Sequence, residues 1–402
     1  MSAGAIATPP LSLMLVCGEP SGDQLGAELM AALNALAPGA VKFSGVGGAA
    51  MEREGLQSLF PLDDTAVMGL REVVPRIPKI LARVREAADF AVTTKPDAVV
   101  LIDSPDFTHR IARRVKKLAP DIATVNYVAP QVWASRQYRA RKMARYFDLV
   151  LALLPFEVPF FETYGLACKF VGHPVVERAA RMTGGAALRT RLGIAPDAPL
   201  LAVLPGSRVS EVTLLMEPFK LAVAELARDV PGLVCVLPTV AHVSARVRAA
   251  AQDWPVPLHI VESEADKFAA FDAANVALAA SGTVTTELAL SQTPMVVAYR
   301  LGWLTHTLMR PLISAPFVTL VNIILEREAI PEFIQRRCTP HLLSSALLNL
   351  FRDRAAYDVQ LRDMGEAMHA LGKDGQPPSQ RAARALLDFA WARKEKAPMQ
   401  IA

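Results

Sequence analysis

Short runs of apolar residues alternate with segments of helical spacing along the first half of the chain. The apolar runs predict strands at 11–17, 41–46, 98–103, 123–128, 149–153 and 168–171. Most of the segments between them repeat apolar residues every three or four positions and predict helices, the first at 25–36. Strands that alternate with helices form right-handed crossovers, so this half is expected to build a parallel sheet.

The second half repeats the same order of elements. Strands are predicted at 200–204, 234–237, 258–261, 275–279 and 295–298, again with helices between them. Residues 175–199 lose the strand pattern and contain Gly184, Gly185 and Pro196, which indicates an interdomain linker. Three helices are predicted after the last strand, at 340–351, 355–371 and 378–394.

These elements predict an α/β fold with two Rossmann-like parallel-sheet domains facing a cleft. We expect domains at 1–178 and 179–360. Residues 361–402 would form helices that pack back on the first domain or on a partner subunit, which leaves a homodimer open. Ligands of parallel sheets bind at the carboxyl ends of the strands, so the cleft is the expected site.

Residues 201–212 are the most informative stretch. An apolar strand stops at Pro205-Gly206, and Ser207 and Ser210 are expected to cap the helix that follows. Arg208 would stand among free backbone N–H groups at the positive end of that helix. This combination favours a phosphate or diphosphate. The alternative is an ordinary strand–helix turn with a solvated arginine.

A second loop of this kind follows a later strand and holds Ser281, Gly282 and Thr283. Glu287 lies about one turn into the next helix, where its carboxylate either accepts from ribose hydroxyls or complements the helix dipole. Two such loops in one domain favour a nucleotide diphosphate. Neither the Walker motif nor the Gly-x-Gly-x-x-Gly pattern is present.

Carboxylates also follow strands of the first domain. Asp103 ends an apolar strand, where a partly desolvated carboxylate serves either as a general base or as a structural ligand. Asp106 is expected to cap the next helix. The loop after the first strand is a further candidate for the cleft, although two of its residues could instead cap a helix; it contains Glu19, Ser21, Gly22 and Asp23.

Residues 67–84 combine apolar and basic side chains at helical spacing. Such a segment either lies on an anionic membrane or packs on the core with a solvated basic face. The basic run at 136–145 has the same two interpretations. The membrane or acyl-chain candidates in the first segment are Val67, Met68, Arg76, Lys79 and Arg83.

Composition narrows the class of protein. With 52% hydrophobic and 20% charged residues the chain is globular, and a net charge of +4 favours anionic small molecules or a membrane surface over nucleic acid. The four cysteines have no metal-ligand spacing, so we expect buried thiols in a reducing compartment and no metal site. No secretory signal is evident, and 301–325 is too interrupted to span a bilayer. We expect a cytoplasmic protein.

The chain contains a series of short motifs in a fixed order over roughly residues 12–350. They include Gly-Glu-Pro-Ser-Gly-Asp at 18–23, Ile-Asp-Ser-Pro-Asp-Phe at 102–107, Tyr-Val-Ala-Pro-Gln-Val-Trp-Ala at 127–134, Leu-Pro-Gly-Ser-Arg at 204–208, and Ser-Gly-Thr at 281–283 with Glu287. In number and order these motifs resemble the lipid-A-disaccharide synthase family.

The resemblance implies a GT-B fold and an inverting glycosyl transfer that needs no metal or other cofactor. The donor would be UDP-2,3-diacylglucosamine and the acceptor 2,3-diacylglucosamine 1-phosphate. Asp103 would take the acceptor proton, and Arg208 would stabilise the leaving diphosphate. The other implied donor contacts come from Gly206, Ser207, Ser281, Gly282, Thr283, Glu287 and Asn322.

Lipid substrates also imply peripheral association with the inner membrane, which favours the membrane interpretation of 67–84. Residues 301–317 are a second candidate for the acyl chains. Two alternatives stay open on the sequence: another UDP-N-acetylglucosamine-using GT-B transferase or epimerase, and a nucleotide-sugar sensor without catalysis.

Overall fold

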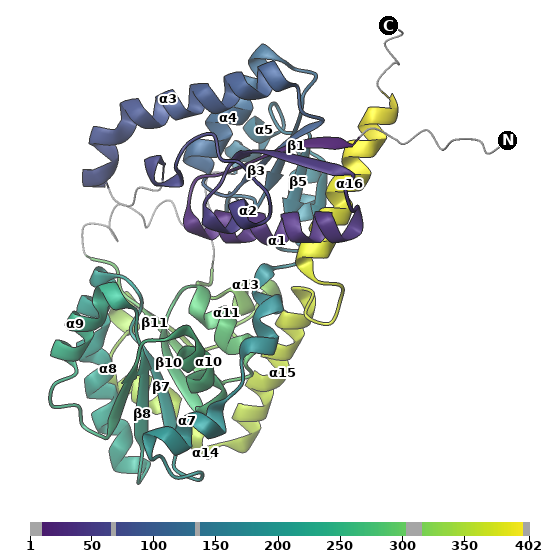
Figure 1. Ribbon diagram of the computed structural model, residues 1–402. Helices are drawn as coiled ribbons and strands as arrows, with labels where there is room; N and C mark the ends of the chain where they lie inside the picture. Colours follow the sequence, from purple (N-terminus) through teal and green to yellow (C-terminus); the bar gives the residue numbers. More distant parts are fainter. Residues whose placement is uncertain (1–9, 66–69, 133–136, 303–315, 397–402) are drawn as a thin grey trace, which may run out of the picture. The chain divides into compact units, whose positions relative to one another are not determined.

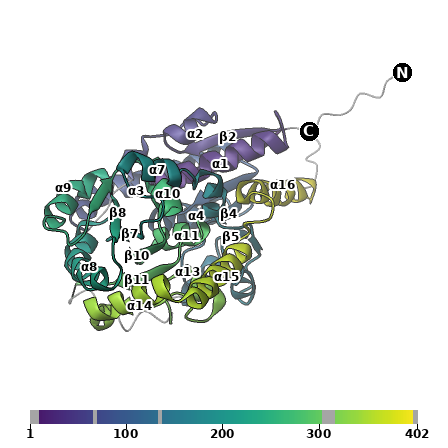
Figure 2. The same ribbon diagram turned by 90° about the horizontal axis from the view of Figure 1, so that it is seen from below.

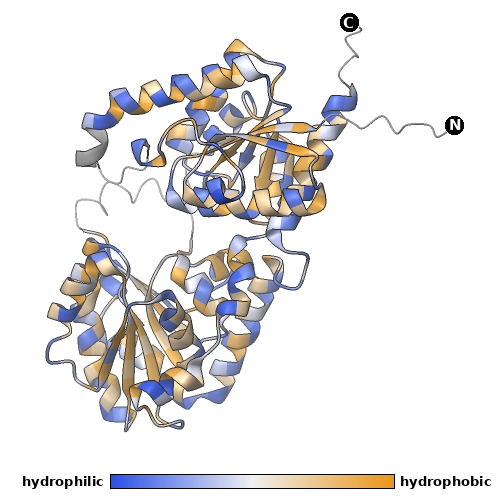
Figure 3. Cartoon of the chain, in the orientation of Figure 1, coloured by the Kyte–Doolittle hydropathy of each residue, from blue (hydrophilic) through white to orange (hydrophobic). Residues whose placement is uncertain are grey.

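The computed structural model describes residues 10–65, 70–132, 137–302 and 316–396, without the side chains of 70–74 and 396. The chain divides into two compact units (Figure 1). Unit 1 comprises Met1–Pro174 and Asp374–Ala402, and unit 2 comprises Val175–Lys373. In Figure 3 the strands of both units are mainly hydrophobic, and the hydrophilic residues lie on the helices and loops.

Unit 1 contains a parallel sheet of six strands in the order β2-β1-β3-β4-β5-β6. Its strands are β1 (Leu11–Cys17), β2 (Val41–Val46), β3 (Ala98–Ile102), β4 (Ala123–Tyr127), β5 (Leu149–Ala152) and β6 (Cys168–Phe170). The chain places β2 on one side of β1 and β3 on the other. The loops that leave β1 and β3 therefore diverge at a topological switch point, where parallel sheets bind their ligands.

Helices cover both faces of this sheet. One core contains residues of α1 (Pro20–Leu36), α2 (Ala49–Arg53) and α16 (Pro378–Lys396). The opposite core contains residues of α3 (Leu70–Thr94), α4 (Pro105–Leu118), α5 (Tyr138–Met143) and α6 (Glu157–Glu162). Helix α1 begins five residues earlier than the predicted helix, because Pro20 suits the first helical turn. Ser21, Gly22 and Asp23 are therefore helical and not part of a loop.

Unit 2 contains a second parallel sheet, in the order β12-β11-β10-β7-β8-β9. Its strands are β7 (Leu200–Leu204), β8 (Val234–Pro238), β9 (Leu258–Val261), β10 (Val276–Ala280), β11 (Met295–Tyr299) and β12 (Glu332–Ile334). Strand β12 was not predicted, because three residues carry no periodic signal. Here the switch point lies between β7 and β10.

The helices of unit 2 also form two layers. One core contains residues of α8 (Val209–Asp229), α9 (Ala241–Ala250) and α14 (Pro340–Arg352). The other layer includes α7 (Gly185–Leu192) and α10 (Glu264–Ala273), which pack together, and α11 (Thr283–Leu290), α13 (Leu320–Leu325) and α15 (Arg354–Ala370). Figure 2 shows the strands between α8 and α14 on one side and α7 and α10 on the other.

Two expected boundaries differ in the structure. The predicted linker at 175–199 contains helix α7 and all but the first residue of the 3-10 segment η2 (Pro174–Arg181), and these residues belong to unit 2. Residue 360 lies inside α15, which packs on α11 and α13 of unit 2, so only α16 belongs to unit 1. There α16 packs along α1 (Figure 1). A helix with one apolar stripe joins whichever core that stripe contacts, and its position in the sequence does not reveal which.

The four cysteines are buried and unpaired, as the sequence analysis expected. Burial raises the pKa of Cys17, Cys168 and Cys235 to about 12, so these thiols stay protonated. Within the described residues, no helix combines the length and the apolar character needed to cross a bilayer.

Candidate functional site

The clearest pocket of unit 2 opens at its switch point. Leu204 pairs with Ala279 in register, so the loops after β7 and β10 leave the sheet side by side. Between them lies a cavity of about 400 Å³. The residues predicted at both loops line it together: Gly206, Ser207, Arg208, Ser281, Gly282, Thr283 and Glu287.

The backbone at Gly206 has a φ of +108°, a conformation that glycine adopts without strain. A Cβ atom there would also come within 2.3 Å of the Glu211 carboxylate. That carboxylate accepts from the backbone N–H of Ser207 at 3.0 Å and of Arg208 at 3.2 Å. From the sequence, these amides were expected to be free and Ser207 and Ser210 to cap the helix. Glu211 reaches back from the first turn of α8 and forms the cap instead.

The Arg208 side chain projects into solvent with 74% of its surface exposed. Its guanidinium contacts Glu211, from Nη1 to Oε1 at 3.3 Å. An exposed guanidinium held by so loose a contact is free to turn onto an anion in the pocket. Arg208 is therefore the cationic side chain of this loop that lines the pocket, beside two amides that are already occupied.

Glu287 lies deep in the same pocket with 5% of its side chain exposed, held by two cations. Arg178 Nη1 donates to its carboxylate at 2.7 Å, and Lys267 Nζ contacts both oxygens, at 3.2 and 3.0 Å. Neither cation was predicted from the sequence, and both also line the pocket. Arg178 lies 109 residues from Glu287 in the chain, so no local spacing could have revealed the pair.

Asn322 is part of a buried network behind the pocket, and its side chain is fully buried. Its Nδ2 donates to Ile330 and Glu332, and its Oδ1 accepts from Ala329 and Ile330. Glu332 also accepts from the backbone at Val318 and Thr319. The Val318 carbonyl in turn accepts from Ser281 Oγ at 3.1 Å, so this network ties the Ser281 loop in place.

In unit 1 the carboxyl ends of β3 and β4 carry unusual backbone conformations. Asp103, Ser104 and Val128 have φ of +52°, +43° and +72°. Such a conformation is a true outlier for a β-branched residue, and outliers of this kind gather at functional sites. Gly18 lies against this bend, since a Cβ atom there would come within 2.8 Å of Ser104 Cβ. Asp103 itself is half-buried.

Asp23 has a role inside unit 1 that the sequence did not suggest. Its buried carboxylate accepts from the backbone N–H groups of Gly48, Ala50 and Met51 at 2.7, 3.0 and 3.1 Å. It thus caps α2 from within α1. Glu19, directly before α1, forms no side-chain cap. Of the predicted acids near β1, Asp23 is therefore structural, whereas Glu19 is not committed to a cap.

Within the basic segment at 67–84, Val67 and Met68 lie outside the described residues, as does most of 301–317. Two of the predicted cations pair with Asp64: Lys79 at 2.5 Å and Arg83 at 2.7 Å. These contacts hold the pKa of the Asp64 carboxyl below its usual value, and the hydrogen bond from Lys79 is the larger cause. Arg76 is exposed, and beside it Ile77 exposes 43% of its surface.

The fold is shared with solved structures of nucleotide-sugar enzymes. A UDP-N-acetylglucosamine 2-epimerase from Listeria monocytogenes matches with a TM-score of 0.63, over 96% of this chain and 98% of that chain, at 15% identity. MurG from Acinetobacter baumannii matches with a TM-score of 0.56, over 96% and 100%, at 16% identity. Identities this low show the fold alone. With two Rossmann-like units and a pocket at the switch point, the protein is of the GT-B class.

Sequence relatives define the family within this class. The family model described as lipid-A-disaccharide synthetase matches residues 13–385. A lipid-A-disaccharide synthase of Rhodospirillum centenum is 48% identical, covering 94% of both chains. One of Paramagnetospirillum magneticum is 45% identical, covering 96% of this chain and 99% of that protein. The chain belongs to the lipid-A-disaccharide synthase family, and it is a glycosyltransferase of lipid A biosynthesis with a UDP-sugar donor and a glycosyl acceptor.

Proposed function

We propose that the protein joins UDP-2,3-diacylglucosamine to 2,3-diacylglucosamine 1-phosphate, giving the β-1,6-linked disaccharide 1-phosphate and UDP. The observation that carries the proposal is the unit 2 pocket, in which Arg208, the Ser281–Thr283 loop and Glu287 surround one cavity. These groups match the diphosphate and the ribose of a UDP-sugar in charge and hydrogen-bonding capacity.

In this mechanism the 6-hydroxyl of the acceptor attacks the anomeric carbon of the donor from the face opposite UDP. The new C–O bond forms as the bond to the diphosphate oxygen breaks, and the configuration inverts. Asp103 accepts the hydroxyl proton. Arg208 and the amides that begin α11 stabilise the charge that develops on the diphosphate, and electrostatic stabilisation of this kind usually contributes most to catalysis.

Glu287 is proposed to hold the ribose while Arg178 and Lys267 fix its carboxylate. A carboxylate offers about four acceptor positions, so both cations and a ribose hydroxyl can share it. Asn322 would act through the loop at Val318 rather than by touching the donor, because its amide is already fully hydrogen-bonded.

The substrates are lipids, so we propose a cytoplasmic protein that associates peripherally with the inner membrane. The exposed strip at Arg76 and Ile77 supports this, because basic side chains beside apolar ones suit an anionic lipid surface. A homodimer is also part of the proposal, and sedimentation of the purified protein tests it.

The test measures UDP release from the diacylated donor, with and without the acceptor phosphosugar. Release should require both substrates. Asp103→Asn is the informative variant, because asparagine tolerates positive φ but is not a base. Turnover should fall roughly 10²–10⁴-fold while UDP binding persists. If this variant turns over normally, Asp103 is not the base, and Glu19 is the next candidate for accepting the proton.

A further inference from the structure

A second cavity lies in unit 1 between α4 and α5, and it encloses about 600 Å³. Its lining is strongly basic. Six cationic side chains contribute, namely Arg113, Lys116, Lys117, Arg139, Lys142 and Arg145. Asp106, at the start of α4, is the one acidic residue among the described residues that line it. The excess of positive charge points to an anionic occupant.

Several of these cations have no carboxylate partner. Lys116 pairs with Asp148 at 2.8 Å, but Arg113, Arg139 and Lys142 form no ion pair with any residue that the structure describes. Instead the Arg113 guanidinium lies 5.3 Å from the centre of the Tyr146 ring, and the Lys142 ammonium 5.0 Å from that of Tyr138. Unpaired like charges around one cavity repel each other, and a bound anion relieves that repulsion.

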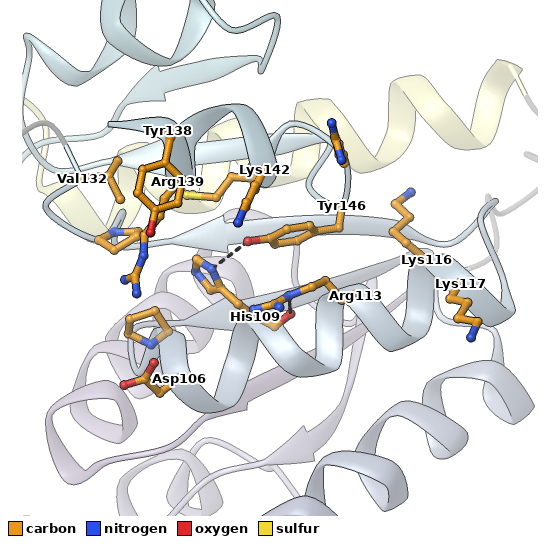
Figure 4. Close-up of a pocket in the computed structure, with 14 residues that line it drawn as sticks. Asp106, His109, Arg113, Lys116, Lys117, Val132, Tyr138, Arg139, Lys142 and Tyr146 are labelled. Atoms are coloured by element: carbon orange, nitrogen blue, oxygen red, sulfur yellow. Dashed lines mark hydrogen bonds between the residues drawn. The ribbon is translucent and has the colours of Figure 1, made fainter. Parts of the chain in front are cut away.

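His109 stands between these cations, as Figure 4 shows. It is only 6% exposed. Its Nδ1 lies 3.2 Å from the Tyr146 hydroxyl, while its buried Nε2 has no partner among the described residues. Burial, with smaller contributions from Arg113 and Arg139, lowers the pKa of His109 to about 3, so the ring is neutral. In the tautomer in which the tyrosine hydroxyl donates to Nδ1, Nε2 carries the proton and is a donor without a partner among the described residues.

The position of the cavity connects it to the reaction. Helix α4 begins at Pro105, two residues after Asp103, and both Pro105 and Asp106 line the cavity. His109 follows Pro105 by one helical turn, a rise of about 6 Å. That distance is comparable with the width of one hexose ring. Asp103 does not itself line the cavity, so a ligand whose hydroxyl lies at Asp103 would pass Pro105 and Asp106 to bring an anionic group to His109 and Arg113.

We propose that the α4–α5 cavity binds the phosphate of the acceptor sugar and so orients the acceptor hydroxyl toward Asp103. The inference rests on the proposed function, since it identifies where that acceptor is held. The headgroup of an anionic phospholipid offers the same chemistry. Arg113 and Lys142 are exposed, as a bilayer surface would require, but the buried imidazole of His109 between them fits one phosphate better than it fits a bilayer.

The experiment uses the full chain in neutral detergent micelles, with Arg113→Gln and Lys142→Gln as variants. Arg141→Gln is the matched control, because Arg141 is exposed, lies next to Lys142 in α5 and does not line the cavity. Both cavity variants should raise the KM for the acceptor roughly tenfold or more, since each removes a charge-assisted hydrogen bond. The KM for the donor should not change. With an acceptor analogue that lacks the phosphate, variants and wild type should be equal.

The outcomes separate this inference from the proposed function. If the wild type releases UDP and both variants keep the acceptor KM of the wild type, the inference is wrong and the proposed function stands. If the wild type releases no UDP, the proposed function is wrong. Calorimetry with glucosamine 1-phosphate then tests whether the cavity binds a sugar phosphate. That binding should weaken in both cavity variants and not in Arg141→Gln. If both variants lose affinity for phosphatidylglycerol vesicles and keep their acceptor KM, the cavity holds a lipid headgroup and the inference is wrong.

Discussion

Arg208 illustrates how a single side chain gains a role from its surroundings. Glu211 occupies the nearby amides of Ser207 and Arg208, so the loop offers fewer free donors than its sequence suggested. The guanidinium remains exposed, and Arg208 lines the pocket together with the loop from Ser281.

Arg208→Ala should lower turnover roughly 10²-fold or more, because the leaving diphosphate loses a charge-assisted donor. Stability should hardly change, since this side chain is exposed and its contact with Glu211 is loose. Steady-state kinetics at saturating donor and thermal unfolding measure the two quantities. Arg246→Ala, an exposed arginine of α9 that does not line the pocket, is the control. Near wild-type turnover in Arg208→Ala would contradict the assignment.

His109 predicts a dependence of stability on pH. Its folded pKa of about 3 lies below the ordinary value of 6.5, so below pH 6.5 the unfolded chain binds a proton that the folded chain refuses. The free energy of unfolding should therefore decrease as the pH is lowered from about 6.5 to about 3. This residue contributes up to about 1.4 kcal/mol per pH unit. Urea unfolding at pH 6.5 and pH 4.5 measures it.

His109→Gln retains a polar side chain at this position but does not titrate. The loss of stability between the two pH values should be smaller in this variant than in the wild type, whatever the carboxylates contribute to both. Equal losses would show that the buried imidazole takes up its proton without cost.

Among the elements, α3 differs most from its expected form. It runs from Leu70 to Thr94 and contains Pro75 and Pro78. Proline removes a backbone donor inside a helix, and exposed turns tolerate this better than buried ones. Toward its C-terminal half Arg83 pairs with Asp64 and Val84 is buried, so that half belongs to the body of unit 1. The strip at 75–79 is exposed, and it is the part of α3 that we propose as the membrane-docking surface.

The double substitution Arg76→Glu with Ile77→Asp should weaken binding to anionic vesicles roughly tenfold or more, because it reverses a charge and removes an apolar contact. High salt should weaken the wild type in the same assay. Arg85→Glu, also exposed and also on α3, is the control for charge alone. If the double variant binds vesicles as well as the wild type does, this strip is not the docking surface.

The whole molecule is organised by the return of the chain to unit 1. Helix α16 packs along α1, and Ala382, Leu386 and Ala390 belong to the same core as β1 and β3. Unit 1 is therefore built from both ends of the sequence, while unit 2 is continuous. A contact between the two ends of the chain closes a long loop, and its formation therefore costs loop entropy.

Leu386→Ala should destabilise unit 1 by about 2–5 kcal/mol, the usual range for a leucine removed from a well-packed core. Leu386 is fully buried, whereas Arg384 on the same helix is exposed, so Arg384→Ala is the matched control. Urea unfolding followed by circular dichroism measures both variants. A difference below about 1 kcal/mol would mean that α16 is not an integral part of that core.

The sequence by itself determined most of the elements, the two-sheet class and the two glycine-containing loops that line the unit 2 pocket, because these depend on local periodicity and on glycine and proline at fixed offsets. It could not assign Asp23 to the cap of α2, pair Arg178 and Lys267 with Glu287, or gather Arg113, Arg139 and Lys142 around His109. Those contacts join residues far apart in the chain. Only the tertiary fold decides which distant side chains become neighbours, and with them which charges are paired and which stay available to a ligand.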